Sequence, residues 1–401
     1  MKKIMILGAS ILQLPAIIKA KEMGLQTIVV DMDKNALGFK EADMCLEIST
    51  IDIPKVVDAA KKNRINGIMT LASDMPMRTV AAVAKELSLV GISEDTALKA
   101  TNKVMMRGCF KEHSVPIPIF FKANTYSDYL TAINKFNGKC IVKPADNSGS
   151  RGVFLVNDIE KETIRFAFEY SKSNSRSGEI IVEEYMNGPE VSVETLSIDG
   201  EVHVIQITDK LTTGAPRFVE MGHSQPTHHT IEIAKQIKKV ASTAVKAIGI
   251  ENGPSHTEIM VTKDGPKVVE LGARLGGDCI TTHLVPLSTG VDMVECCIRI
   301  ALGEKADITP KFNKGSAIRY FNSYAGVIES IQGVEEAEMI EGVKQIGFVK
   351  AIGEIIPDIG SSSDRIGFVI SQNESNDAAI MSCEDAILRI IVTIISDKYK
   401  K

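Results

Sequence analysis

The sequence lacks the marks of a membrane or secreted protein. None of its apolar runs reaches the roughly 18 to 20 residues that a bilayer-spanning helix needs, and a strand pattern begins directly after Lys2 and Lys3. Its seven scattered cysteines form no CxxC pair and have no histidine at zinc-finger spacing. We therefore expect reduced, mostly buried thiols, no zinc site, a cytoplasmic location and no membrane partner.

The chain also lacks an excess of positive charge. Its formal net charge is −5 and its pI is near 5.9, whereas nucleic-acid-binding domains usually carry a clustered basic surplus. We therefore expect no nucleic-acid partner. Any anion that the protein binds should be small and held locally.

Length and composition indicate several packed units. A chain of 401 residues is too long for one ordinary core. Hydrophobic residues make up 44% and charged residues 24%, which is the balance of a folded globular protein. Two to four structural units with a cleft between them are the expectation.

Apolar strand patterns alternate with helical patterns in the first part of the chain. Residues 3–8 and 27–30 are typical of buried strands in a parallel α/β unit. The tail has short glycine-punctuated strands and a predicted last helix near 377–395. The predicted fold class is α/β and α+β, with an N-terminal doubly wound α/β domain at 1–100, further units at 101–185 and 186–308, and a small C-terminal α+β domain at 309–401.

The first strand ends at Gly8, where a dinucleotide-binding fingerprint would begin. The run from Gly8 to Gln13 lacks the second and third glycines that let the backbone approach a pyrophosphate. Asp31 closes the second strand, as the ribose acid of that fingerprint would, but an acid there also serves as a turn or cap. A nicotinamide oxidoreductase would rest on these features alone.

A lysine and a glycine-rich turn form the first candidate site. Lys143 ends an apolar strand, and residues 148–153 read Ser-Gly-Ser-Arg-Gly-Val. This arrangement places an ammonium and several backbone N–H groups around one concavity, which suits a triphosphate. The spacing differs from a Walker A loop, and a surface hairpin is the alternative interpretation.

A second candidate site follows the next strand, which ends at the acidic pair Glu183 and Glu184. The main chain of Tyr185 and Met186 lies before a turn and could meet the edge of an adenine ring, while Glu190 could reach ribose hydroxyls. Surface acids beside a turn would look the same.

The third candidate site is the most specific. Glu258 lies on one predicted strand and Glu270 on the next, with a turn at 263–265 between them. Two carboxylates brought together in this way suit Mg²⁺ that bridges phosphates. A solvated hairpin face would not explain Arg274 or the pair Gly276-Gly277 that follows.

These three signals occur in the order and spacing of the ATP-grasp superfamily, and the resemblance spans most of residues 1–305. The chain resembles in particular the branch of L-amino-acid ligases and pyrrolysine-pathway ligases. The resemblance implies an ATP-grasp fold, in which 101–185 is the lid and nucleotide subdomain and 186–308 is the metal and substrate subdomain.

The resemblance also implies a role for each candidate residue. Lys103 and Lys143 would hold ATP phosphates under the loop 148–153, and Glu190 would bind ribose. Glu258 and Glu270 would carry Mg²⁺ or Mn²⁺. The full set of implied ATP-binding residues is Lys103, Lys143, Ser148, Gly149, Ser150, Gly152, Val153, Glu183, Glu184, Tyr185, Met186 and Glu190.

The implied catalytic residues are Arg274, Glu220 and His223. Arg274 would steady the transferred phosphoryl group and the acyl phosphate. The segment 218–226 is similar to a substrate-side loop of the branch, where Glu220 could meet an ammonium. His223 could orient a carboxylate or accept a proton from the attacking amine, although a histidine in a polar loop can also be merely exposed.

One position departs from the family pattern. Many members have an asparagine two residues after the second metal acid, where this chain has Gly272. Two carboxylates still suffice for one Mg²⁺, because this ion keeps several waters and takes phosphate oxygens. The coordination of a second ion is what the departure puts in doubt.

The function implied is an ATP-dependent carboxylate–amine ligase that works through an acyl phosphate and releases ADP and phosphate. Its small-molecule substrates would be amino acids, and the resemblance suggests a homodimer. Two alternatives stay open beside the oxidoreductase: a carboxylase-type enzyme that activates bicarbonate, and a non-catalytic nucleotide-binding module.

Overall fold

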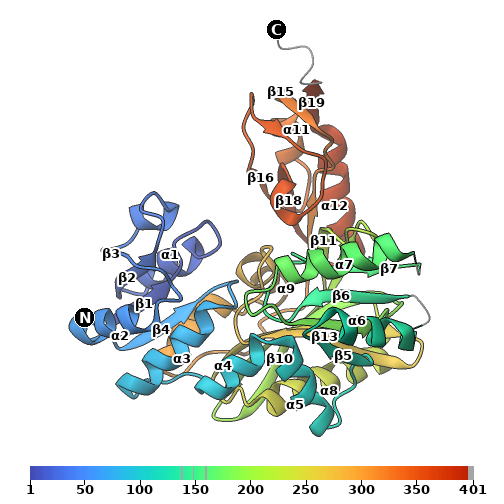
Figure 1. Cartoon of the computed structure of the whole chain (residues 1–401). Helices are drawn as coiled ribbons and strands as arrows, with labels where there is room; N and C mark the ends of the chain where they lie inside the picture. The colour runs from blue at the N-terminus through green and yellow to red at the C-terminus, as the bar shows by residue number, and fades with distance from the viewer. Residues whose placement is uncertain (137–138, 148, 159, 396–401) are drawn as a thin grey trace.

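The computed structural model describes residues 1–136, 139–147, 149–158 and 160–395, so Ser148 of the predicted phosphate loop lies outside it. Figure 1 shows the N-terminal unit beside a central body, with the C-terminal helices and strands rising above that body. Among the helices of the described residues, none combines the length and the apolar character needed to span a bilayer.

The N-terminal unit is built on a small parallel sheet. Its four strands lie in the order β3-β2-β1-β4 and pair in parallel. The elements of this unit are β1 (Lys3–Leu7), α1 (Leu14–Glu22), β2 (Gln26–Asp31), β3 (Met44–Glu47), α2 (Ile53–Asn63), β4 (Gly67–Thr70) and α3 (Pro76–Leu87). The predicted doubly wound start is confirmed, and β3 is a strand that the sequence pattern did not indicate.

Asp31 has a local role at the end of β2. One carboxylate oxygen accepts a hydrogen bond from the Ala9 N–H at 2.8 Å, and the other accepts one from the Asp33 N–H at 2.9 Å. Asp31 is therefore engaged as a cap of the neighbouring turns.

The second unit is a four-stranded antiparallel sheet in the order β5-β8-β6-β7. Buried side chains such as Tyr129, Val142 and Ile164 form its own small core. Its elements and the helices that lead to it are α4 (Glu94–Ala100), α5 (Lys103–Glu112), β5 (Phe120–Ala123), α6 (Tyr126–Ile133), β6 (Cys140–Pro144), β7 (Phe154–Val156), α7 (Lys161–Ser173) and β8 (Ile180–Glu184).

An eight-stranded sheet forms the centre of the molecule, in the order β13-β12-β9-β10-β11-β14-β18-β16. Its last three strands come from the C-terminal part of the chain, which therefore extends the central sheet. The strands are β9 (Glu190–Ile198), β10 (Glu201–Thr212), β11 (Glu220–Gln225), β12 (Gly253–Thr262), β13 (Gly265–Gly272), β14 (Gly315–Tyr320), β16 (Val343–Phe348) and β18 (Gly367–Asn373).

Helices cover the eight-stranded sheet. A small three-stranded sheet completes the C-terminal part. The small sheet has the order β17-β15-β19. The remaining elements are α8 (Ile231–Ile248), a π-helical turn (Ile280–Leu284), α9 (Val285–Thr289), α10 (Met293–Ala301), β15 (Gly326–Gln332), α11 (Val334–Glu338), β17 (Ile355–Ile356), α12 (Asn376–Arg389), β19 (Ile391–Ile395) and short 3-10 turns at Leu37–Lys40, Asn134–Phe136 and Ser362–Asp364.

Two expectations from the sequence are wrong at this level. The last helix, predicted to run to 395, ends at Arg389, and residues 391–395 pair with β15 instead. The run Ile-Val-Thr-Ile-Ile favours a strand, because branched side chains fit a pleated surface better than a helix. The predicted substrate-side loop at 218–226 is largely the strand β11, which pairs with β10 and β14.

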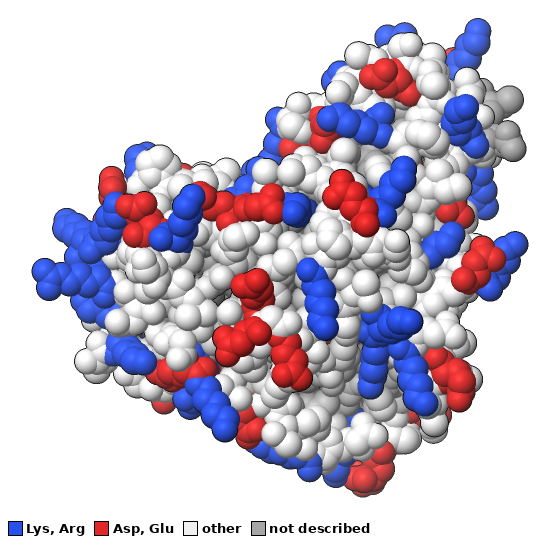
Figure 2. Space-filling view, turned by 90° about the horizontal axis from the view of Figure 1, so that it is seen from below, with Lys and Arg blue, Asp and Glu red and all other residues white. Residues whose placement is uncertain are grey.

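Charge is mixed on the face shown in Figure 2. Lys and Arg side chains stand beside Asp and Glu side chains in small groups across that face. The described residues on this face therefore form no continuous basic surface.

Candidate active site

The predicted metal acids lie opposite each other on a β-hairpin. Glu258 of β12 and Glu270 of β13 are direct partners in the antiparallel register, and a bulge follows Glu258. Residues paired in this way project from the same face of the sheet. The two carboxylates are hard oxygen donors, so their chemistry fits a Mg²⁺ ion.

Lys103 connects one of these acids to the glycine-rich segment. Asn102 caps α5 by accepting a hydrogen bond from the Met105 N–H, so Lys103 is the first residue of the helix. The Lys103 ammonium lies 2.6 Å from Glu270 Oε1 and 2.6 Å from the Asn147 carbonyl oxygen. Lys103 is 7% exposed, so its charge is held between the metal acid and the predicted phosphate loop.

Lys143 is held by a buried ion-pair cluster at the other side of that loop. The carboxylate of Glu183 lies 2.7 Å from the Lys143 ammonium and 2.6 Å from Arg107 Nε. Burial alone would raise the pKa of Glu183, but the two cations lower it to about 2. Burial lowers the pKa of Lys143 while Glu183 opposes that shift.

This cluster changes how Glu183 can act. Both carboxylate oxygens of Glu183 already accept from cations, so an adenine contact from this residue would have to come from its main chain. Arg107, which the sequence interpretation missed, also donates to the Val269 carbonyl at 2.7 Å and thereby connects the β5-β8-β6-β7 sheet to β13.

The described part of the glycine-rich loop turns back sharply from β6 to β7. Gly149, Ser150 and Gly152 have positive φ values of 65°, 56° and 79°. A Cβ atom at Gly152 would lie 2.6 Å from Pro144 Cγ, so only glycine fits there. Val153 ends this turn just before β7 begins.

The predicted adenine hinge follows β8. Glu184 accepts a hydrogen bond from the Ile119 N–H at 3.2 Å, and the Lys267 ammonium lies 3.4 Å from both of its oxygens. The Lys139 ammonium lies over the Tyr185 ring, 4.4 Å from its centre. Met186 is half-buried.

Lys210 of β10 is the main site residue that the sequence interpretation missed. Its ammonium lies 2.7 Å from Glu190, 2.8 Å from Glu220 and 2.9 Å from Glu258, and its side chain is 3% exposed. Despite burial, these carboxylates raise the pKa of Lys210 well above its ordinary value. A lysine at an inward-facing position of a strand is the signal that could have found it, because lysine is almost never buried unless paired.

The contacts of Lys210 connect three predicted roles. Glu190 was assigned to ribose, Glu220 to a substrate ammonium and Glu258 to the metal. Burial raises the pKa of Glu190, with Lys210 opposing this shift. Burial would also raise the pKa of Glu258, but Lys210 and His256 lower it well below its ordinary value.

His256 lies between Glu258 and a further acid, Glu194. Its Nδ1 lies 2.7 Å from Glu194 Oε1 and its Nε2 lies 3.6 Å from Glu258 Oε1. Burial alone would lower the pKa of His256, but the Glu194 carboxylate raises it to about 9. The imidazole therefore connects Glu194 to Glu258, one of the two predicted metal acids.

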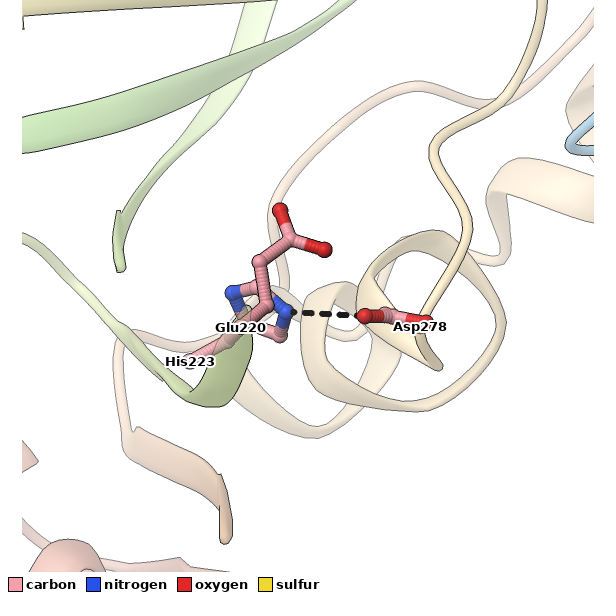
Figure 3. Close-up of side chains that lie close together, drawn as sticks. All are labelled: Glu220, His223 and Asp278. Carbon is pink, nitrogen blue, oxygen red and sulfur yellow. Dashed lines mark hydrogen bonds and ion pairs between the residues drawn. The ribbon is translucent and has the colours of Figure 1, made fainter. Parts of the chain in front are cut away.

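A second group of polar side chains, Glu220, His223 and Asp278, lies together, as Figure 3 shows. Glu220 and His223 come from β11, Asp278 comes from the segment before the π-helical turn, and their donor atoms all lie within 4.8 Å of one another. His223 is fully buried, and its Nε2 lies 3.5 Å from Asp278 Oδ2. The expectation of a histidine in a polar loop is wrong, because β10 and β14 flank it on both sides.

This group has the ligand types of a metal site, but its carboxylates are already paired. Lys210 faces Glu220, and Arg365 makes two contacts of 2.8 Å with the two oxygens of Asp278. A further cation would have to compete with both. The predicted metal acids Glu258 and Glu270 are paired in the same way, with Lys210 and Lys103, so pairing alone does not choose between the two groups.

Arg274 is held by an acid of the N-terminal unit. Its Nε lies 2.9 Å from Asp74 Oδ1 and its Nη2 lies 3.4 Å from Asp74 Oδ2. This pair also explains the departure at Gly272. A Cβ atom there would lie 2.8 Å from Asp74 Oδ1 and 3.0 Å from Arg274 Cζ, so an asparagine would displace the pair.

The structure therefore brings five of the predicted residues into two adjoining groups. The first joins the predicted metal acids Glu258 and Glu270 to Lys103 and Lys210, and the second joins Glu220 and His223 to Asp278 and Arg365. Lys143 reaches neither group by a direct contact and lies in the neighbouring Glu183 cluster.

Comparison with known protein families identifies two domains of the chain. Residues 136–282 match the ATP-grasp domain model, and residues 319–394 match the model of L-amino acid ligase C-terminal domain 2. The chain therefore carries an ATP-grasp domain and is an enzyme of the ATP-grasp ligase class, whose members bind ATP and form C–N bonds.

Individual relatives support the same class. A phosphoribosylamine–glycine ligase of Methanococcus vannielii is 27% identical over 404 residues, which cover 93% of this chain and 90% of the relative. An L-arginine-specific L-amino acid ligase of Bacillus subtilis is 24% identical over 283 residues, covering 69% of this chain and 67% of the relative.

A solved structure shows the shared fold. The L-amino acid ligase from Bacillus licheniformis superposes with a TM-score of 0.84 at 24% identity, and the match covers 99% of both chains. The predicted ATP-grasp fold is thereby confirmed.

Proposed function

We propose that the protein is an ATP- and Mg²⁺-dependent ligase that joins an amino-acid carboxylate to an amine through an acyl phosphate. The pairing of Glu258 with Glu270, beside the Lys103 ammonium, is the observation that supports this most. Two carboxylates and a cation at one place suit a metal–triphosphate complex. The C-terminal match to L-amino acid ligases supports amino acids as substrates.

The bound groups would supply the driving chemistry. ATP supplies the phosphoryl group that makes the carboxylate a good electrophile, and Mg²⁺ supplies positive charge against the phosphate oxygens. Glu258 and Glu270 would hold the metal, with Lys103 and Lys143 on the phosphates. Arg274, oriented by its ion pair, would steady the negative charge of the transferred group.

The substrate side follows from the second group. Glu220 would accept the ammonium of an amino acid. Because His223 is fully buried, its supported role is to orient the neighbouring carboxylates. The segment around 115–185 would close as a lid that keeps water from the acyl phosphate, and the proposed homodimer is testable by sedimentation.

One assay tests this function. The purified protein is incubated with Mg²⁺ and ATP, and ADP and phosphate are measured with single amino acids, pairs of amino acids and bicarbonate, with Glu270→Gln as the control. Release that needs amino acids and is lost in the variant supports the ligase. Release driven by bicarbonate points to a carboxylase, and ATP binding without release on any substrate points to a nucleotide-binding module.

A further inference from the structure

Arg365, from the C-terminal part of the chain, reaches into the substrate side. Its two terminal nitrogens lie 2.8 Å from the two oxygens of Asp278, and Nη1 also donates to the Glu220 carbonyl at 3.1 Å. A guanidinium that meets a carboxylate through two parallel bonds fixes orientation as well as charge. One residue thus holds two separate segments of the substrate side.

Arg365 is itself held on its remaining sides. Its Nε donates to the Ser362 carbonyl at 2.8 Å, and its guanidinium lies 3.7 Å from the centre of the Tyr320 ring. The preceding turn is fixed by Asp364, which accepts from the N–H and the hydroxyl of Ser361 at 2.7 Å and 2.9 Å. With only 8% of its surface exposed, Arg365 arrives at Asp278 in one preset geometry.

The segment that carries Asp278 needs an external hold. Asp278 and Cys279 have φ values of 50° and 62°, a left-handed conformation that is strained for L-residues. A π-helical turn over Ile280–Leu284 follows directly, and such turns occur frequently at functional sites. The ion pair with Arg365 offsets this backbone cost.

A second contact joins the same parts of the chain. Arg217, just before β11, donates to the carbonyl of Ile359, which precedes the turn that presents Arg365. By contrast, Lys103 contacts Asn147 and Glu270, and Lys143 contacts Glu183.

We propose that Arg365 is a positioning residue of the substrate site. By holding Asp278 and the Glu220 carbonyl, it sets the distance between β11 and the segment 276–284, and so fixes where Glu220 and His223 stand. The C-terminal segment thereby determines the affinity for the amino-acid substrate and leaves the affinity for ATP unchanged. This inference rests on the proposed function, in which Glu220 meets the substrate ammonium.

Kinetics and nucleotide binding test the proposal together. Arg365→Gln should raise the KM of one amino-acid substrate by about 10- to 100-fold, because uniform binding is lost. The affinity for a fluorescent ATP analogue should change by less than about twofold. The KM of Arg365→Lys should lie between those of the wild type and Arg365→Gln. An ammonium keeps the positive charge but cannot make the two parallel hydrogen bonds of a guanidinium. Asp278→Asn should match Arg365→Gln, and the double variant should be no worse than either.

A matched control separates positioning from general loosening. Asn376 is buried and donates to the Pro226 carbonyl, so it joins α12 to the end of β11 without contacting Glu220, His223 or Asp278 in the described hydrogen bonds. Asn376→Ala should lower thermal stability while leaving the KM near that of the wild type. An equal rise in KM for this variant, an unchanged KM in Arg365→Gln or parallel loss of ATP-analogue affinity overturns the proposal.

Hydrogen exchange gives a readout that does not need the ligase reaction. In Arg365→Gln, amides over 276–284 should exchange faster, while those around Lys103 and Glu270 should exchange as in the wild type. If the wild type releases no ADP with any amino acid, the proposed function fails, and this exchange pattern alone then decides whether Arg365 positions the segment. Unchanged exchange over 276–284 overturns the positioning role.

Discussion

The ammonium of Lys210 lies 2.9 Å from Glu258 Oε1, one of the two proposed metal acids. The same ammonium lies 2.7 Å from Glu190 and 2.8 Å from Glu220. A lysine has three N–H donors, and here each has a carboxylate acceptor. A single buried cation therefore fixes one oxygen on the proposed ribose, metal and substrate acids.

This arrangement predicts that Lys210→Met strongly lowers both the stability and the turnover of the protein. Removing the cation leaves three carboxylates facing one another in a buried place, which should cost about 3–5 kcal/mol of unfolding free energy. Turnover should fall by about 100-fold or more, because the acids lose their preset orientation. Denaturant unfolding and ADP release measure the two effects.

Lys210→Arg is the control for charge. It keeps the positive charge but not the three-way geometry, so it should recover most of the stability and less of the turnover. A Lys210→Met protein that unfolds at the same denaturant concentration as the wild type would show that these contacts carry little energy.

Local patterns were enough to find part of this site. Glu258 and Glu270 are separated by a short turn, so a hairpin alone brings them opposite each other. For Lys103 the local pattern indicated only the start of a helix after Asn102, a good N-cap. Its role as a phosphate ligand came from the resemblance to the ATP-grasp superfamily.

The rest depends on contacts between distant segments. Arg365 and Asp278 are 87 positions apart, and Arg274 and Asp74 are 200 apart. No periodicity or turn signal reaches over such separations. The same limit applies to β11, because the resemblance implies a loop at 218–226 and the partner strands β10 and β14 come from two different parts of the chain.

The Asp74–Arg274 pair leads to a prediction at Gly272. Gly272→Asn introduces the residue that the family resemblance leads us to expect there, yet its Cβ would lie 2.8 Å from Asp74 Oδ1. We expect a loss of about 1–3 kcal/mol in unfolding free energy from overpacking. Turnover should fall as well, because Arg274 loses its orienting acid.

A second substitution tests whether the clash with Asp74 causes the loss of stability in Gly272→Asn. Asp74→Gly removes the clashing carboxylate, so in the Gly272→Asn background it should recover part of the lost stability. Turnover should stay low in that double variant, since Arg274 is then unpaired. Full activity in Gly272→Asn alone would contradict the role given to the pair.

The Glu183 cluster predicts an acid-dependent stability. The pKa of Glu183 is lowered to about 2, against about 4.3 for an unfolded glutamate. The contribution of Glu183 to the free energy of unfolding is therefore present above about pH 4.3 and is lost as the pH falls toward 2. Glu183→Gln should cost about 3–5 kcal/mol at pH 7, because Lys143 and Arg107 stay buried without a carboxylate.

Urea unfolding at several pH values checks this prediction. The difference between the wild type and Glu183→Gln should be largest at neutral pH and should shrink below about pH 4. Glu184→Gln is the neighbouring control. Its partner Lys267 lies 3.4 Å away in a partly exposed place, so the change should stay below about 1 kcal/mol.

His228 predicts a pH dependence of opposite sign. Its Nδ1 lies 3.0 Å from Asp209 Oδ2 and its Nε2 lies 2.8 Å from Asp377 Oδ1, so it joins β10 to α12. Burial lowers the pKa of His228, but Asp377 and Asp209 outweigh it and raise the pKa. The contribution of His228 to the free energy of unfolding is therefore complete below about pH 6.5, the pKa of an unfolded histidine. It is lost as the pH rises through the pKa of His228 in the folded protein.

His228→Gln should remove this contribution. Because the His228 side chain is 46% exposed, screening by water limits the expected loss to about 0.5–1 kcal/mol at pH 6. The wild type and the variant should converge at pH 9. His203 is the matched control, since its nearest acid, Glu201, lies 3.9 Å away. A pH-independent difference for His228→Gln, or an equal pH-dependent loss for His203→Gln, would show that the ion pairs with Asp209 and Asp377 are not the cause.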